Sequence, residues 1–199
     1  ETKKAQAILE DDRTLFAASK SDEIDLSLLR ELHLMTAKPF LYVFNSDEAV
    51  LTDDAKKDEL RQLVAPAECV FLDAQTETDL LELDEAEALE LLESVGQEEP
   101  GLATLAKAGF ATLGLQTYLT AGPKEARAWT IKQGSAAPQA AGVIHTDFEK
   151  KFIKAEIVSF DDLDAAGSMA EARNAGKVRQ EGKEYIMQDG DVCDFKIGG

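Results

Sequence analysis

The chain has 199 residues, of which 44% are hydrophobic and 30% charged, and its formal net charge at pH 7 is -18. A chain of this length can bury one or two hydrophobic cores, and it has no apolar run of ~18 residues, so we expect neither a membrane-spanning helix nor a membrane partner. The two cysteines, Cys69 and Cys193, lie far apart in the sequence and indicate reduced thiols in a cytoplasmic protein rather than a disulfide or a metal pair.

The negative charge is concentrated in the first part of the chain. Residues 1–123 contain 10 Lys and Arg against 26 Asp and Glu, whereas residues 124–199 contain 11 against 13. The acidic first part would repel a phosphate backbone, while the nearly neutral last part can present a local basic face to RNA. This change coincides with Gly122-Pro123, which we therefore predict to be a domain boundary.

The first elements along the chain are predicted to be helical. Residues 3–32 carry apolar anchors such as Ile8, Leu15 and Leu29, and Ser21-Asp22 can cap a second helix that runs to residue 34. This pattern is compatible with one arm of a helical hairpin.

The next segment alternates between strands and helices. The apolar run at 40–44 predicts a buried parallel strand, and residues 68–72 predict a second one. Helices are expected at 52–64, at 78–95, which is strongly acidic, and at 102–119. This spacing predicts an α/β architecture with parallel strands.

From residue 125 onward, the alternation of side chains is typical of strands. Strands are expected at 126–131, 152–160 and 185–187, with one helix near 168–174. The last part of the chain is therefore predicted to be a small α+β domain.

Three runs of this last part resemble one protein family. They are GVIHTDFEKKFIKAE at 142–156, RAWTI at 127–131 and KEYIMQDGDVCDF at 183–195. Similar runs occur in the closing TGS domain of the Obg-like ATPase (YchF) family, a branch of the translation-related P-loop NTPases. The resemblance extends back through Asn45-Ser46-Asp47-Glu48 to about Leu9, so it covers nearly the whole chain.

The resemblance implies a fold class of α/β plus α+β in three parts. Residues 1–36 would form a helical (coiled-coil) arm, 37–122 the C-terminal part of an Obg-type P-loop NTPase domain, and 123–199 a TGS domain with a β-grasp fold. The few short strands and the single helix expected after residue 125 fit a β-grasp.

Asn45, Glu48 and Ala74 are the candidate base-binding residues. The segment from Asn45 to Glu48 follows the first strand at its carboxyl end, where α/β sheets bind ligands. GTPases carry Asn-Lys-x-Asp here, whose last carboxylate accepts two hydrogen bonds from guanine. The family pattern Asn-x-x-Glu matches Asn45 and Glu48 and implies a preference for ATP over GTP. In the loop that backs the purine, Asp73 departs from the usual small residue, so the resemblance extends only to Ala74 and its backbone N–H.

We identify no catalytic residue and no metal ligands in the sequence. The segment at 176–184 has five rather than four residues between its glycines, and Glu184 stands where Ser or Thr must meet Mg²⁺. His145 and Asp147 have no activated nucleophile near them in the sequence, so a structural histidine is favoured. Without a P-loop, this chain alone should bind nucleotide weakly and hydrolyse none. The resemblance implies that the intact protein binds ATP (or GTP) with Mg²⁺ and hydrolyses it slowly.

Lys150, Lys151 and Lys154 are candidate RNA contacts. If 150–154 is a strand, Lys150, Phe152 and Lys154 share one face and form a stripe of basic and aromatic side chains. Alternatively, the phenylalanines lie in the core and the lysines in water. The resemblance implies the ribosome or ribosomal RNA as a partner, without DNA specificity.

Two functions therefore remain open. The chain is either the C-terminal portion of a ribosome-associated, Obg-like purine-nucleotide-binding protein, or a stand-alone RNA- or protein-binding adaptor built on a TGS β-grasp domain. Nucleotide binding that depends on Asn45 and Glu48 would support the first function only.

Overall fold

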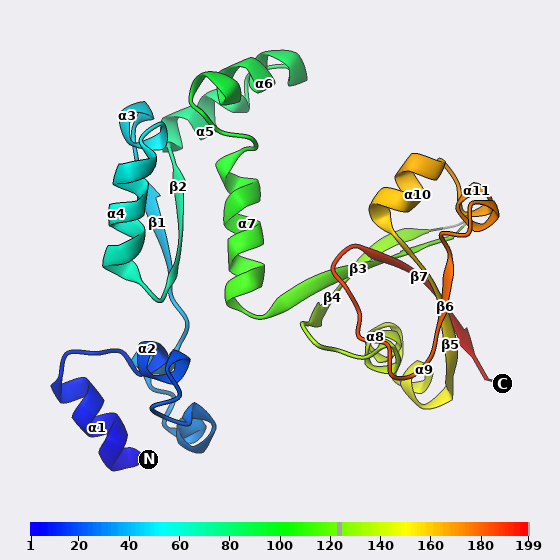
Figure 1. Ribbon diagram of the computed structural model, residues 1–199, viewed down its shortest axis with the longest axis horizontal. Coiled ribbons are helices and arrows are strands. Elements are labelled where there is room, and N and C mark those ends of the chain that lie inside the picture. Colours follow the sequence, from blue (N-terminus) through cyan, green and yellow to red (C-terminus); the bar gives the residue numbers. More distant parts are fainter. Residues whose placement is uncertain (123–124, 199) are drawn as a thin grey trace. The chain divides into compact units, whose positions relative to one another are not determined.

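The computed structural model describes residues 1–122 and 125–198, which fall into two compact units (Figure 1). The first unit is Glu1–Leu113 and the second is Gly114–Gly199. The predicted boundary at Gly122-Pro123 lies partly outside the described residues, since 123 and 124 are not among them. The division falls earlier because Leu115–Ala121 is already a strand of the second unit's sheet.

The first 37 residues are helical but do not form one long helix. They contain α1 (Thr2–Glu10), α2 (Leu15–Lys20) and the 3₁₀ helices η1 (Leu26–Leu32) and η2 (Met35–Ala37). The predicted break at Ser21-Asp22 is present, and a further break occurs at Asp12, because Asp12 and Asp22 adopt left-handed φ values of 53° and 56° and turn the chain back. Instead of an extended coiled coil, the segment closes around a small core of its own: Ala5, Ile8, Leu15, Ala18, Ile24 and Leu29.

The rest of the first unit is an α/β segment. Its elements are β1 (Leu41–Asn45), α3 (Glu48–Leu51), α4 (Asp54–Val64), β2 (Glu68–Leu72), α5 (Ala74–Leu80), α6 (Glu85–Ser94) and α7 (Gly101–Thr112). β1 and β2 pair in parallel, as predicted. β1 is not fully buried, since Tyr42 and Val43 are 43% and 47% exposed. The described part of this sheet has only these two strands.

Two predicted helices differ from the structure. The acidic helix expected at 78–95 is two helices, because Asp84 begins α6 with a capping box to Glu87. The helix expected at 102–119 ends as α7 at Thr112, and Gly114, with φ of 63°, turns the chain into a strand. The alternating residues after Gly114 are therefore β3 and not a helical continuation.

The second unit is a mixed five-stranded sheet with helices. Its elements are β3 (Leu115–Ala121), β4 (Ala126–Lys132), α8 (Ala137–Ile144), α9 (Thr146–Lys151), β5 (Phe152–Ser159), α10 (Phe160–Ala166), α11 (Met169–Asn174), β6 (Arg179–Glu181) and β7 (Asp191–Ile197). The strand order is β4-β3-β7-β5-β6, and only β3 and β7 pair in parallel. The strand predicted at 185–187 is only an isolated bridge between Ile186 and Ala136.

Both faces of this sheet are partly covered, because successive strand residues point to opposite sides. Ile157 and Cys193 belong to the larger core with the alanines of α8, whereas their neighbours Val158 and Val192 pack with Ala172 of α11. The α/β segment and this α+β unit agree with the predicted fold class. None of the described helices is long and apolar enough to cross a bilayer.

Candidate functional site

Asn45 and Ala74 lie together at the carboxyl ends of β1 and β2. The backbone N–H of Ala74 donates to Oδ1 of Asn45 at 3.0 Å, although the two residues are 29 positions apart. The N–H of Ser46 donates to the Leu72 carbonyl at 2.8 Å and continues the ladder in which Asn45 faces Leu72. These bonds fix the two loops against each other at the edge where α/β sheets bind ligands.

The four residues after β1 have separate roles. Asp47 is the N-cap of α3, and its Oδ1 accepts the N–H of Val50 at 3.2 Å. The Ser46 hydroxyl donates to the Phe44 carbonyl at 3.3 Å. Glu48 is exposed, and its carboxylate has no hydrogen-bond or ion-pair partner among the described side chains. Of the two acids in this turn, Glu48 is therefore the one available to a ligand.

The structure changes the expected role of Ala74. We predicted that its N–H contacts the base, but this N–H is already donated to Asn45, so Ala74 holds the turn in place instead. Asp73 is the N-cap of α5, where Oδ1 accepts the N–H of Gln75 and Oδ2 accepts the hydroxyl of Thr76, both at 3.0 Å. This capping role accounts for an acidic residue where the family pattern has a small one.

Glu77 supports this edge of the sheet and was not identified from the sequence. Its carboxylate accepts the N–H of Gly101 at 2.6 Å and that of Leu102 at 3.2 Å. The first turn of α7 therefore receives its cap from α5, since its own N-cap residue is Pro100. Because the partners are 24 residues apart, no local sequence pattern signals this contact.

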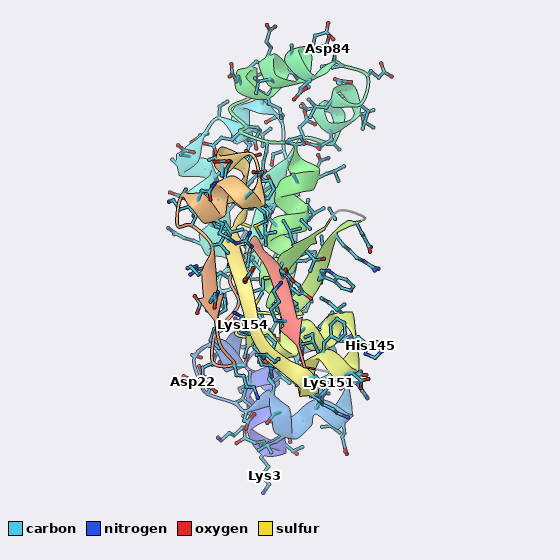
Figure 2. The ribbon with its side chains drawn as sticks, turned by 90° about the vertical axis from the view of Figure 1, so that its right-hand side faces the viewer. Lys3, Asp22, Asp84, His145, Lys151 and Lys154 are labelled. Carbon is cyan, nitrogen blue, oxygen red and sulfur yellow. The ribbon has the colours of Figure 1, made fainter. Side chains whose placement is uncertain are left out.

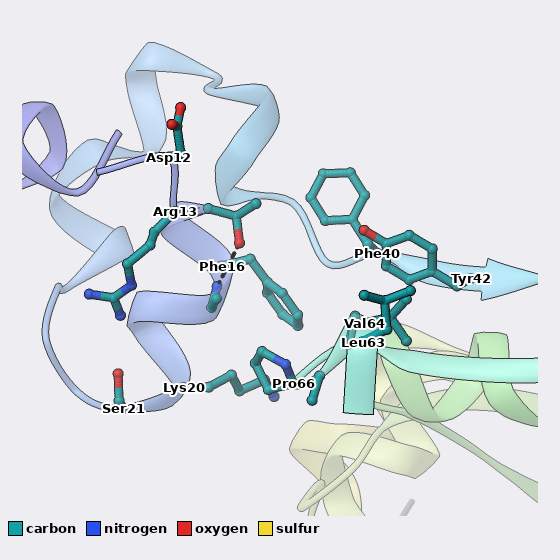
Figure 3. Close-up of a pocket in the computed structure, with 14 residues that line it drawn as sticks. Asp12, Arg13, Phe16, Lys20, Ser21, Phe40, Tyr42, Leu63, Val64 and Pro66 are labelled. Carbon is teal, nitrogen blue, oxygen red and sulfur yellow. Dashed lines mark hydrogen bonds between the residues drawn. The ribbon is translucent and has the colours of Figure 1, made fainter. Parts of the chain in front are cut away.

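A separate cavity of about 650 Å³ lies near the amino end of β1 (Figure 3). Phe16 and Lys20 of α2 line it together with Phe40 and Tyr42, and the Lys20 ammonium lies 5.3 Å from the centre of the Phe16 ring. The cavity is at the opposite end of β1 from Asn45. It is therefore not part of the candidate base site.

Lys150, Lys151 and Lys154 do not form the predicted stripe. Lys150 and Lys151 are the last residues of α9, whereas Lys154 is on β5. Phe152 is only 3% exposed and belongs to the larger core. The strand-face prediction was therefore wrong, and the alternative of buried phenylalanines describes this segment.

These lysines nevertheless occupy neighbouring elements. Lys154 faces Lys196 across the β5–β7 pair, and its ammonium donates to Oε1 of Gln180 at 2.9 Å. Figure 2 shows Lys151 and Lys154 at the same end of β5.

At the start of α9, Nδ1 of His145 accepts the N–H of Asp147 at 3.2 Å, so this histidine is a helix cap.

Several known proteins are similar in sequence to this chain. Residues 115–198 match the family YchF-GTPase_C, described as a protein of unknown function (DUF933). The "Ribosome-binding ATPase YchF" of Bacillus subtilis (strain 168) is 48% identical over 175 residues, which are 85% of this chain and 48% of that protein. "Obg-like ATPase 1" of Rattus norvegicus is 39% identical over 184 residues, which are 87% of this chain and 45% of that protein. The chain thus spans about half the length of the curated relatives it matches.

Solved structures give a consistent comparison. The Schizosaccharomyces pombe YchF GTPase matches with a TM-score of 0.69 and 32% identity, covering 98% of this chain and 55% of that one. A GTP-binding protein from Pyrococcus horikoshii OT3 matches with a TM-score of 0.53 and 16% identity, covering 98% of this chain and 64% of that one. At that identity the second match shows a likeness of fold alone.

Proposed function

The chain belongs to the YchF family of Obg-like ATPases, and from this premise we propose that it is the C-terminal portion of a ribosome-associated protein that binds purine nucleotides and prefers ATP to GTP. In this proposal the intact protein hydrolyses the nucleotide slowly in the cytoplasm. The chain contributes the base-recognition turn and a C-terminal TGS domain with a β-grasp fold.

The contact between Asn45 and Ala74 carries the nucleotide part of the proposal. It ties two loops together at the carboxyl ends of parallel strands. Beside it, the exposed Glu48 carboxylate has no hydrogen-bond or ion-pair partner among the residues that the structure describes. A polar turn held in one geometry costs little further ordering when a ligand binds. We assign Asn45 the role of shaping the turn and Glu48 that of facing the base.

The choice of base follows from the hydrogen-bonding edges of the two purines. Guanine presents the N1–H and N2–H donors that an aspartate accepts in Asn-Lys-x-Asp, whereas adenine presents an acceptor at N1. Here Ser46 and Glu48 replace that Lys and Asp, and Asp47 is engaged in capping α3. The carboxylate at the fourth position is therefore carried on a side chain one methylene longer than aspartate, and no lysine stem packs on the base. This departure from Asn-Lys-x-Asp supports the preference for ATP.

The described residues at this edge of the sheet offer groups for a base. Asn45 and Glu48 provide an amide and a carboxylate suited to a purine edge. No group of three or more His, Cys, Asp and Glu side chains in the described part of the chain is arranged to hold a metal. Because the chain spans about half the length of its curated relatives, we propose that the remaining part of the intact protein holds the phosphates and Mg²⁺.

The second unit carries the ribosomal part of the proposal. Lys150, Lys151 and Lys154 are concentrated at one end of β5 in a unit whose charge is nearly balanced. Local positive charge of this kind attracts an anionic ribosomal surface. The name of the Bacillus subtilis relative, a ribosome-binding ATPase, gives independent support.

A change of base preference tests the nucleotide part. In the intact protein, Ser46→Lys with Glu48→Asp rebuilds Asn-Lys-x-Asp and should shift the ATP:GTP ratio toward GTP by at least roughly tenfold, since a hydrogen bond to a charged acceptor contributes about 1.5–3 kcal/mol. The measurement is competition of ATP and GTP against a fluorescent nucleotide. Asp47→Asn is the control, because it keeps a capping acceptor and should leave the ratio unchanged. An unaltered ratio in the double variant would contradict the proposed role of this turn.

A further inference from the structure

We infer that Glu77 is a positioning residue of the proposed base site: its bonds to the start of α7 hold α5, and with it the Ala74 N–H that orients Asn45. Without these bonds, we expect the intact protein to lose affinity for the base of a nucleotide and to keep its affinity for the phosphates. This inference rests on the proposed function, because it assigns the support of the same site.

The helix α5 has little apolar packing of its own. It is 7 residues long and none of them is buried, whereas the helices α6 and α7 that follow it each contain a buried residue. Most of the stability of helices in proteins comes from packing an apolar face. The position of α5 therefore depends on hydrogen bonds to other elements.

Hydrogen bonds hold α5 on two sides. On the side of β1, the Ala74 N–H donates to Oδ1 of Asn45 at 3.0 Å. On the side of α7, the Glu77 carboxylate accepts the N–H groups of Gly101 at 2.6 Å and Leu102 at 3.2 Å. Figure 1 shows α5 beside the start of α7. Within the described part of the chain, these three are the side-chain hydrogen bonds that join α5 to other elements.

A single turn of backbone connects the two sides. The Glu77 N–H donates to the carbonyl of Asp73 at 3.0 Å, and Asp73 is the N-cap residue that precedes Ala74. The hydroxyl of Thr78 donates to the carbonyl of Ala74 at 2.9 Å. Because these bonds make one rigid turn, a shift of Glu77 moves the Ala74 N–H as well.

The start of α7 approaches this turn closely. A Cβ atom on Gly101 would lie 2.7 Å from Cβ of Leu72 and 2.8 Å from Oε1 of Glu77. Leu72 is the last residue of β2, and Asp73 follows it. The first residue of α7 therefore lies against both the end of β2 and Glu77, and a residue larger than glycine would force one of them to move.

The support of a binding turn affects ligand affinity through its geometry. Binding groups have to be held within about 0.5 Å of the productive geometry, and a turn that is loose before binding must be ordered when the ligand binds. Without Glu77, the bond between Ala74 and Asn45 is held from one side only. In the proposed function the remaining part of the intact protein holds the phosphates, so the loss should be confined to ligands that carry a base.

The test compares ATP with inorganic tripolyphosphate, which has the phosphates but no base. Each is titrated with Mg²⁺ against a fluorescent nucleotide bound to the intact protein, and the ratio of the two inhibition constants gives the preference for ATP over tripolyphosphate. Glu77→Ala should lower this preference by roughly three- to tenfold, the cost of ordering one loose group on binding. A variant that only lowers the folded fraction changes the amount of active protein and leaves the ratio unchanged.

Further variants show whether the contact itself is responsible. Glu77→Gln should keep most of the preference, because its amide oxygen can still accept the Gly101 N–H. Gly101→Ala should lower the preference as Glu77→Ala does, since the added methyl group displaces α7 or the carboxylate. Two controls should leave the preference within about twofold. Glu82→Ala removes the same charge from the exposed turn after α5, and Gly109→Ala adds the same methyl group to α7 where it meets nothing within 4 Å.

Asn45→Ala separates this inference from the proposed function. A lower preference in both Asn45→Ala and Glu77→Ala would support both. A lower preference in Asn45→Ala alone would leave the proposed base site standing and overturn the positioning role of Glu77. If neither variant lowers the preference, both are overturned. A lower preference in Glu77→Ala alone would contradict the proposed turn and overturn the route through Ala74 and Asn45.

Discussion

The carboxylate of Glu77 accepts a hydrogen bond of 2.6 Å from the backbone N–H of Gly101. The same carboxylate accepts a second hydrogen bond, of 3.2 Å, from the backbone N–H of Leu102. One acidic side chain therefore satisfies two of the backbone N–H groups in the first turn of α7 that have no partner within the helix. Its negative charge also lies at the positive end of the helix dipole. Glu77 follows Ala74 by one helical turn, and this contact therefore connects the loop of the proposed base site to α7.

Glu77→Ala is expected to destabilise the first unit by about 1–2 kcal/mol, the usual cost of losing a helix cap. Trp129 is the single tryptophan and lies in the second unit. The urea midpoint followed by far-ultraviolet circular dichroism should therefore move to a lower urea concentration. The midpoint followed by tryptophan fluorescence should stay unchanged. Glu82→Ala removes the same charge from the exposed turn after α5 and is the control. Equal circular-dichroism midpoints for the two variants would show that the contact adds no stability.

Two glycines of α7 should respond in opposite directions to the same substitution. A Cβ atom on Gly101 would lie 2.7 Å from Cβ of Leu72 and 2.8 Å from Oε1 of Glu77, whereas one on Gly109 meets nothing within 4 Å. Gly109→Ala should therefore stabilise the first unit by roughly 0.5–1 kcal/mol through helix propensity. Gly101→Ala should destabilise it, because β2 or Glu77 must move. The same urea titration measures both, and stabilisation by Gly101→Ala would refute the close approach.

The two strands of the first unit and the turn after β1 could be predicted from local sequence patterns. The apolar run before Asn45 and the polar turn after it are features of consecutive residues, and the structure places them as expected. The helix predicted across Gly114 failed for a different reason. A single glycine with positive φ separates α7 from β3, and the partners that make residues 115–121 a strand come later in the chain.

The candidate site residues that the sequence patterns missed or misplaced depend on long-range contacts. The hydrogen bond from Ala74 to Asn45 changes Ala74 from a predicted base donor into a residue that fixes the turn. The pattern around Phe152 alternates as in a strand, but β5 begins only at that residue, so Lys150 belongs to a helix. The approach of Lys196 to Lys154 follows from strand pairing, which no local pattern encodes.

Acid should weaken the N-terminal helical segment through Glu23. Hydrogen bonds from Arg13 and then Ser21 lower the pKa of its carboxyl from 4.5 to about 2. The folded form thus binds fewer protons than the unfolded one, so the stabilisation is fully present above about pH 4.5 and is lost as the pH falls toward 2. In Arg13→Gln the Glu23 pKa should rise toward its ordinary value, as measured by carboxyl NMR titration. Arg30→Gln is the control, and the same Glu23 titration in both variants would contradict this assignment.

The two thiols should differ in reactivity. Burial raises the pKa of Cys193 strongly and that of the half-buried Cys69 less, so both are mainly protonated at neutral pH. Iodoacetamide at pH 8 should label Cys69 slowly and Cys193 only after unfolding, as followed by mass spectrometry. Cys69→Ser should therefore leave the native protein almost unlabelled. Labelling of Cys193 at the rate of Cys69 would mean that the core around β7 opens in the native state.

The 199-residue chain by itself should bind ATP with Mg²⁺ only weakly and show no ATPase activity. In the described residues, Asn45 and Glu48 can contact a base, but no cluster of side chains is arranged for a metal ion. Phosphates and Mg²⁺ supply most of the charge-assisted contacts in nucleotide sites, so base contacts alone should give a dissociation constant of about 0.1–1 mM, or roughly 4–5.5 kcal/mol. Isothermal titration calorimetry measures this value, with Asn45→Ala as the variant expected to weaken it further. A micromolar constant would refute the prediction and reveal a phosphate site within this chain.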